Sequence, residues 1–103
     1  MKWELHSDAI DELINLPEEH RELIKKNIEA RKARKNPITS QRGVGISYDN
    51  HGEPIQYFKA ENEDLSYRVF FTITDSKVIL IGFRPRDNDT YLNLRDYTKR
   101  TKD

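Results

Sequence analysis

The chain has 103 residues, which is enough for one hydrophobic core and too few for two. It contains no cysteine, and this excludes disulfides, thiolate chemistry and cysteine-ligated zinc. Its net charge is zero although 35% of its residues are charged, and taken alone this balance argues against a nucleic-acid partner. No apolar run reaches membrane-spanning length and the N-terminus lacks the character of a signal peptide, so we expect a cytoplasmic protein.

The charges are nevertheless segregated along the chain. Residues 1–24 carry a net charge of −5 and residues 25–42 a net charge of +6, whereas residues 43–66 carry −4 and residues 67–103 carry +3. Segregation of this kind can place a local basic surface on a neutral protein. For the basic segment, two interpretations stay open: a nucleic-acid contact, or an ordinary solvated helix end.

The N-terminal third predicts a short strand followed by two helices. Residues 2–6 alternate like a strand, and Ser7 is expected to cap a helix whose apolar stripe runs over residues 9–16. Pro17 ends that helix and suits the first turn of the next, which Asn36-Pro37 terminates. The predicted buried face of the second helix consists of Leu23, Ile24, Ile28 and either Ala30 or the stem of Arg31.

The rest of the chain changes to strand periodicity. Strands are predicted at residues 44–48, 54–60, 67–73 and 78–83, separated by clusters of turn residues, and a last helix at residues 91–100. Together the elements predict one α+β domain spanning residues 1–103. In it, an N-terminal strand and an antiparallel helical hairpin pack on one face of an antiparallel sheet.

Alternation along the strands predicts which side chains share a face. The face toward the helices should hold Tyr67, Val69, Phe71, Ile73, Ile79, Ile81 and Phe83. The open face should hold Tyr57, Lys59, Arg68, Phe70, Thr72, Val78, Leu80, Gly82 and Arg84. Arg68 is the informative residue, because a charge in the most apolar strand is costly unless it is paired. Either it forms a salt bridge, with Glu61, Asp87 or the C-terminal carboxylate, or it binds an anion.

A cluster of cations favours the second interpretation. Four are predicted to lie close together on this face without matching acids: Lys59, Arg68, Arg84 and Arg86. Gly82 would let a ligand approach the backbone, and Pro85 is expected to aim the two arginines beside it at a common point. A phosphate group is the ligand that this arrangement predicts.

At this point the sequence resembles the RelE/ParE superfamily of type II toxins. The resemblance is carried by the order of the elements, by YRVFFTI at residues 67–73 and by RPR at residues 84–86. Asn36-Pro37 after the second helix and Arg42-Gly43 before the sheet are also similar, and the resemblance covers nearly the whole chain. It implies a toxin with a cognate antitoxin, and in the RelE branch a ribosome-dependent messenger RNA endonuclease that needs no metal or other cofactor.

The resemblance also suggests roles for individual residues. Arg68 matches the phosphate-contacting arginine of the central strand, and either Arg84 or Arg86 matches the arginine after the next strand. Tyr91 matches a C-terminal tyrosine, and Lys59 lies near the basic residues of the preceding strand. The residues assigned to RNA contact are Lys32, Lys35, Arg42 and Tyr57.

Such a nuclease would direct a ribose 2′-OH at the adjacent phosphate, leaving a 2′,3′-cyclic phosphate and a free 5′-OH. The reaction needs a base, an acid and positive charge, and arginine can supply only the charge. Lys59 and Tyr91 are therefore the candidates for base and acid. Two alternatives stay open: a ParE-like toxin that poisons DNA gyrase without cleaving RNA, and a non-catalytic regulatory module on the same fold.

Overall fold

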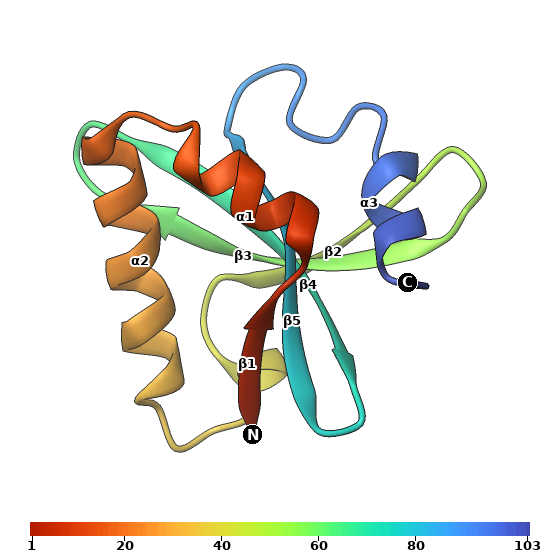
Figure 1. The fold of residues 1–103 in the computed structure, drawn as a ribbon, viewed down its shortest axis with the longest axis horizontal. Helices are drawn as coiled ribbons and strands as arrows, with labels where there is room; N and C mark the ends of the chain where they lie inside the picture. The colour runs from red at the N-terminus through yellow and green to blue at the C-terminus, as the bar shows by residue number, and fades with distance from the viewer.

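The computed structural model describes all 103 residues and contains one five-stranded sheet with helices on both faces (Figure 1). The elements in chain order are β1 (Lys2–Leu5), α1 (Ser7–Ile14), α2 (Glu18–Lys32), the short 3-10 helix η1 (Ile38–Ser40), β2 (Val44–Tyr48), β3 (Pro54–Glu61), β4 (Ser66–Thr74), β5 (Lys77–Pro85) and α3 (Arg95–Arg100). The strand order across the sheet is β1-β5-β4-β3-β2. The predicted α+β class is confirmed. The sheet is mixed, because β1 runs parallel to β5 while the other neighbours are antiparallel.

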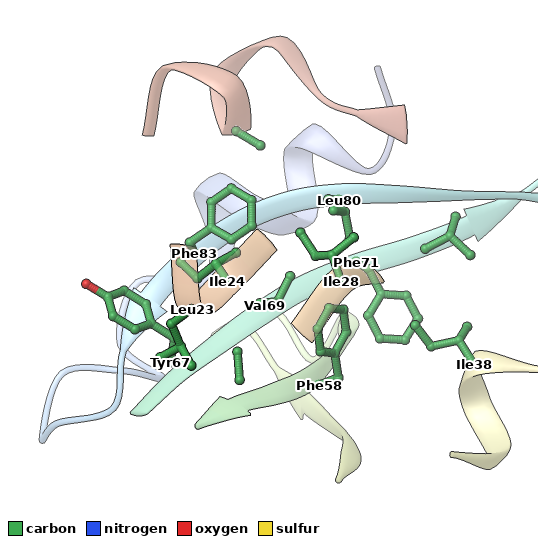
Figure 2. Close-up of a cluster of buried hydrophobic side chains, with 13 residues drawn as sticks. Leu23, Ile24, Ile28, Ile38, Phe58, Tyr67, Val69, Phe71, Leu80 and Phe83 are labelled. Atoms are coloured by element: carbon green, nitrogen blue, oxygen red, sulfur yellow. The ribbon is translucent and has the colours of Figure 1, made fainter. Parts of the chain in front are cut away.

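The main core lies between the sheet and the pair of helices α1 and α2 (Figure 2). Leu23, Ile24 and Ile28 of α2 are buried as predicted, and Ala9 is the buried residue of α1. Of the two alternatives for the last buried position of α2, Ala30 is exposed and the arginine after it is buried. The aromatic residues Phe58, Phe71 and Phe83 of three different strands fill the sheet side of this core.

The first helix has a different cap from the predicted one. Ser7 is the first residue of α1, and the capping residue is His6, whose Nδ1 accepts a hydrogen bond of 3.1 Å from the backbone N–H of Asp8. The imidazole replaces the expected hydroxyl because His6 is still in an extended conformation, where it continues β1 and its own N–H donates to the carbonyl of Leu80.

A β-bulge in β5 changes which side chains face the helices. Phe70 of β4 pairs with Gly82, but Phe71 pairs with Leu80, so Ile81 is an extra residue in β5. An extra residue reverses the alternation of the strand on one side of the bulge.

The prediction for the first half of β5 is therefore wrong. Val78 and Leu80 lie in the core under the helices, whereas Ile79 and Ile81 lie on the opposite face. Beyond the bulge the alternation returns to the predicted phase, and Phe83 is in the main core. The simple alternation rule fails here because it assumes regular pairing. Gly82 next to the bulge is a residue type that often marks such an irregularity, but it does not show which residue is the extra one.

A second, smaller core covers the face that was predicted to be open. Ile55, Phe70 and Ile81 of the sheet pack there against Leu94 and Tyr97 at the beginning of α3. The helix α3 therefore lies on the opposite side of the sheet from α1 and α2, at the end where the β2–β3 hairpin turns (Figure 1).

The last helix begins at Arg95 rather than at Tyr91. Asn93 has a left-handed backbone with φ of 54°, which a right-handed helix cannot contain. Before it, the Thr90 hydroxyl donates to the carbonyls of Pro85 and Asp87 and so fixes a series of turns. Residues 86–94, called the C-terminal loop below, therefore cross the sheet as an ordered non-helical segment.

We expect Gly82→Ala to lower the free energy of unfolding by about 1–3 kcal/mol, because a β-carbon at this position would overlap the ring of Tyr97. Urea denaturation of the two proteins measures the difference. The same substitution should cost clearly less in a Tyr97→Ala background, where the ring is absent. Equal destabilisation in both backgrounds would show that the close packing of Gly82 and Tyr97 is not the cause.

Candidate functional site

Three of the predicted site residues form one row across the sheet. Lys59 of β3 lies opposite Arg68 of β4, and Arg68 lies opposite Arg84 of β5. We call these three residues the cationic row. Arg68 is 3% exposed in the middle of the row, while Lys59 is exposed at one side. The sheet register thus brings together three cations that are 25 residues apart in sequence from first to last.

The buried guanidinium of Arg68 is held mainly by neutral oxygens. Its Nε donates to the hydroxyl of Tyr91 at 3.1 Å, and its Nη1 donates to the hydroxyl of Ser66 and the carbonyl of Tyr67, both at 3.3 Å. The only carboxylate close to it is Glu61 at 3.9 Å, on an exposed side chain. The salt bridge considered from the sequence is therefore a minor contact, and the positive charge of Arg68 is largely uncompensated.

Two tyrosines complete the surroundings of Arg68. The rings of Tyr57 and Tyr91 lie 5.5 Å apart, and the guanidinium of Arg68 is 5.9 Å from the ring of Tyr57. Burial alone would raise the pKa of Tyr91, but hydrogen bonds from Tyr57 and Arg68 and the charges of Arg68 and Arg86 outweigh it and lower that pKa. The pKa of Tyr57 is raised, mainly by its hydrogen bond to Tyr91 and by burial. The phenol of Tyr91 is thus the more acidic of the two.

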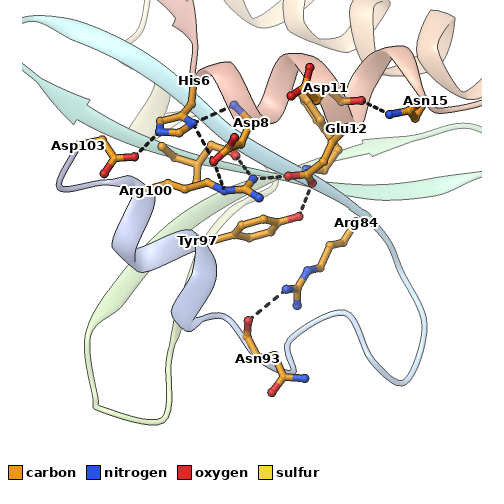
Figure 3. A network of polar contacts seen from close by, with 12 residues as sticks. His6, Asp8, Asp11, Glu12, Asn15, Arg84, Asn93, Tyr97, Arg100 and Asp103 are labelled. Carbon is orange, nitrogen blue, oxygen red and sulfur yellow. Dashed lines mark hydrogen bonds and ion pairs between the residues drawn. The ribbon is translucent and has the colours of Figure 1, made fainter.

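Arg84 has a different environment from the one predicted. Its Nη1 donates to the carbonyls of Thr90 and Leu92, and its Nη2 donates to the carbonyl of Asn93 at 3.2 Å. The guanidinium also stacks on the ring of Tyr97, with its carbon 4.5 Å from the ring centre. Arg84 therefore holds the C-terminal loop on the sheet (Figure 3), and its donors point to the protein's own carbonyls.

The two arginines around Pro85 are not aimed at a common point. Arg84 stacks on Tyr97, whereas the charge of Arg86 acts on Tyr57 and Tyr91. The expectation that Gly82 leaves room for a ligand is also wrong, because the ring of Tyr97 occupies the space next to it.

The residues assigned to RNA contact do not all lie at this site. Tyr57 belongs to it, as described above. Lys32 is the last residue of α2, Lys35 follows in the loop, and Arg42 is an exposed residue just before β2. Lys32 and Lys35 therefore lie at the end of the helix that packs on the opposite face of the sheet from the cationic row, and Arg42 lies at the start of β2.

A polar network that the sequence reasoning missed connects α1 with α3 (Figure 3). The hydroxyl of Tyr97 donates to a carboxylate oxygen of Glu12 at 2.6 Å, and Arg100 bonds the other oxygen and stacks on Tyr97 at 4.8 Å. Burial and the neighbouring Glu12 raise the pKa of Tyr97 to about 12, so this phenol stays protonated and donates. An acid such as Glu12 near the start of α1 is explained by the helix dipole, so the sequence gives no reason to look for another partner. Tyr97 and Arg100 lie 85 and 88 positions away from it, and no local pattern indicates these contacts.

A second missed anchor attaches α3 to the β2–β3 turn. The buried carboxylate of Asp49 accepts from the hydroxyl of Thr98 at 2.6 Å and from Arg95 at 3.2 Å, and also from the backbone N–H groups of His51 and Glu53. Desolvation opposes ionisation of Asp49, but these four donors outweigh it and hold its pKa well below the usual range. An aspartate at the start of a turn was visible in the sequence, but its contact with α3 was not.

The anchor at Asp49 makes stability depend on pH. Because the pKa of Asp49 is lower in the folded state, its contribution is complete above the unfolded pKa of about 3.9 and is lost as pH falls below that value. When the pH is lowered from about 4.5 to about 3, we expect the urea midpoint of the wild type to decrease by more than the urea midpoint of Asp49→Asn. The exposed Asp89→Asn variant serves as the matched control and should follow the wild type. Parallel curves for the wild type and Asp49→Asn would rule out Asp49 as the titrating group.

Comparison with solved structures relates this arrangement to known folds. The RelE–RelB complex of the archaeon Pyrococcus horikoshii matches with a TM-score of 0.55 over 84% of this chain and 96% of that chain, at 18% identity. A double arginine-to-alanine mutant of the E. coli toxin RelE in the free state matches with a TM-score of 0.54 over 98% of this chain and 94% of that chain, also at 18% identity.

The chain has the RelE fold. No protein-family model matches the sequence, and no curated protein does, so the shared fold rests on the three-dimensional comparison. It confirms the fold that the resemblance at YRVFFTI and RPR implied. In this example of the RelE fold, the cationic row crosses the three central strands. None of the helices is long and apolar enough to span a membrane.

Proposed function

We propose that the protein is a type II toxin that cleaves messenger RNA on the ribosome, and that a cognate antitoxin neutralises it. The observation that carries the proposal is the contact between Tyr91 and Arg68 beside Lys59. It combines a group that can transfer a proton with positive charge whose one acidic neighbour, Glu61, is exposed and 3.9 Å from Arg68. The RelE fold adds support, because one of the matching structures is a RelE–RelB complex.

The environments of Lys59 and Tyr91 suggest how the two candidate groups divide the work. Hydrogen bonds from Tyr57 and Arg68 lower the pKa of Tyr91 and so make its phenolate more readily available as a base. We assign it to accept the proton of the ribose 2′-OH as the 2′-oxygen bonds to phosphorus. Lys59, as an ammonium, then gives a proton to the departing 5′-oxygen when its bond to phosphorus breaks.

Arg68 and Arg86 are the arginines assigned to the charge that builds up on the phosphate oxygens. Arg68 is rigid because it is buried and bonded, and positive groups that are already in place need no reorganisation during the reaction. Arg86 is exposed and its side chain forms no hydrogen bond or ion pair within the protein, so its guanidinium is free to contact the substrate. Of the two arginines that the resemblance left open, we therefore favour Arg86 over Arg84.

The test is expression from a tightly controlled promoter in bacteria, with messenger RNA 5′ ends mapped by primer extension. We expect growth arrest and cuts in phase with codons for the wild type, and neither for Lys59→Ala or Arg68→Ala. Lys59→Ala is the cleaner of the two variants, because this side chain is exposed and has no partner. Cuts that persist in both variants would contradict the assigned site.

One observation keeps a second candidate function in view. Both Nη atoms of Arg84 donate to the protein's own carbonyls, and the chain has no net positive charge to hold it on the ribosome. Both features suit a toxin that acts on a protein target such as DNA gyrase. Growth arrest without RNA cuts, unchanged by Lys59→Ala, would favour that candidate.

A further inference from the structure

A basic hollow lies at the C-terminal end of α2, on the side of the sheet away from the cationic row. Its volume is about 270 Å³, and four of the ten residues that line it are cations: Arg31, Lys32, Arg34 and Lys35. No acid lines it. The loop after α2 brings these residues next to the start of β1 (Figure 1), where Trp3 forms part of the wall.

Arg31 is the buried residue of this hollow, and it has no acidic partner. It is 6% exposed and stacks on the ring of Phe58, with its guanidinium carbon 4.6 Å from the ring centre. Its Nη1 donates to Gln41 at 3.5 Å and its Nη2 to the carbonyl of Lys59 at 3.3 Å, while its Nε, which forms no hydrogen bond within the protein, is accessible to solvent. A buried cation with only neutral acceptors still lacks compensation for its lost hydration.

The neighbouring charges increase that deficit. Burial and the positive charge of Arg34 lower the pKa of Arg31 to about 10. Of the four cations, only Lys32 has an acidic partner, Glu29 at 3.4 Å on the outer surface of α2. Cations near the end of a helix are favoured by its dipole, which explains why they are there but leaves Arg31 without a counter-charge. An anion in the hollow would supply one.

The position of the hollow indicates which anion. The Nη2 of Arg31 donates to the carbonyl of Lys59, whose side chain points to the opposite face and begins the cationic row. The two sites are therefore back to back on β3. Between them, at the start of β2, the chain has the exposed Arg42 and then Gly43, where an added β-carbon would come within 3.0 Å of Arg31 and 3.7 Å of Lys59.

We infer that the basic hollow binds a backbone phosphate of RNA, and that the strand passes over Gly43 to reach Lys59. Guanidinium groups match phosphate oxygens in pairs, and several cations without acids suit a polyanion better than a single carboxylate. The inference deepens the proposed function, on which its choice of RNA rests, because it gives the substrate a second contact outside the site of cleavage.

The test compares two double variants with the same change in net charge. Arg34→Gln with Lys35→Gln removes two cations of the hollow, whereas Lys25→Gln with Lys26→Gln removes two from the part of α2 that lines a different surface. The probe is a fluorescein-labelled ten-nucleotide RNA with 2′-O-methyl groups, which cannot be cleaved, and binding is followed by fluorescence anisotropy at several salt concentrations. Arg31 is left unchanged so that the fold is preserved.

We expect the hollow variant to bind the RNA about tenfold more weakly than the wild type. The slope of its affinity against salt concentration, both as logarithms, should be shallower by about 0.7 for each phosphate that the variant no longer neutralises. The control variant should stay within about twofold of the wild type. Adding inorganic phosphate should also shift the Nε–H resonance of Arg31 in an NMR titration of the wild type. Equal weakening in both variants would overturn the inference, and so would an Arg31 resonance that neither phosphate nor RNA moves.

Two further outcomes separate this inference from the proposed cleavage. If phosphate shifts Arg31 but RNA affinity is the same in the hollow variant and the wild type, the hollow takes a free phosphate and the RNA assignment is overturned. If RNA binding depends on the hollow while expression of the wild type produces no RNA cuts, the binding site stands and the nuclease proposal fails.

Discussion

Replacing Tyr91 by phenylalanine is expected to lower the single-turnover rate of messenger RNA cleavage on programmed ribosomes by about 10²–10⁴-fold, the usual contribution of a positioned acid or base. The ring contact with Tyr57 survives this change, and only the hydroxyl that accepts from Arg68 is removed. RNA binding should therefore change little while the rate falls. Weaker binding with an unchanged rate would assign Tyr91 to substrate contact instead of proton transfer.

The pH dependence of the same reaction gives a sharper test of the role of Tyr91. If its phenolate is the base, the rate rises with pH until the pKa of Tyr91 is passed. Arg86→Ala removes a positive charge that lowers this pKa, so the rising part of the profile should move to higher pH. Lys99→Ala, the same change in charge on an exposed position of α3, should leave the profile where it is. A profile that Arg86→Ala does not move would exclude Tyr91 as the titrating base.

The second large effect is expected at Arg84, and it is an effect on stability. Arg84→Ala removes hydrogen bonds to three carbonyls and the stacking on Tyr97, and we expect the free energy of unfolding to fall by about 2–4 kcal/mol. Urea denaturation measures this decrease. In a hydrogen-exchange experiment, Arg84→Ala should increase the exchange rate of the backbone amides in the C-terminal loop by more than that of the amides in the sheet.

Arg86→Ala is the matched control for this change. It removes the same charge two residues away, from an exposed side chain without partners, and should alter the free energy of unfolding by less than about 0.5 kcal/mol. In the cleavage assay, Arg86→Ala should lower the rate by more than Arg84→Ala does, since Arg86 is the arginine assigned to the reaction. Similar destabilisation of the two variants would show that the carbonyl contacts of Arg84 contribute little.

Much of the fold could be predicted because its elements are marked by local sequence. Pro17 and Asn36-Pro37 separate the helices, and the apolar runs of β4 and β5 define the central hairpin. The bulge at Ile81 was missed because it depends on how two strands pair, and Gly82 beside it was the single local sign of an irregularity. The start of α3 was missed because a left-handed Asn93 is an outcome of the contacts that the C-terminal loop makes.

The candidate site was predictable to the same degree as the sheet register. Lys59, Arg68 and Arg84 alternate onto one face in sequence, and their adjacency follows once the strands pair. What the sequence could not give is the partner of each cation. The contact of Arg68 with Tyr91 depends on the path of the C-terminal loop, and so do the contacts of Arg84 with backbone carbonyls. That Arg84 holds the C-terminal loop on the sheet is therefore known from the structure alone.

The parallel pairing of β1 with β5 has a consequence for the order of folding. Lys2 pairs with Lys77, so the first strand gains its only partner after all the other strands of the sheet have been made. Closing so long a loop is slow, and local contacts such as the β4–β5 hairpin should form before it. The cationic row also requires β5. On a translating ribosome, the nascent protein thus stays without its complete sheet and without its assembled row of cations until residues 77–85 have been made.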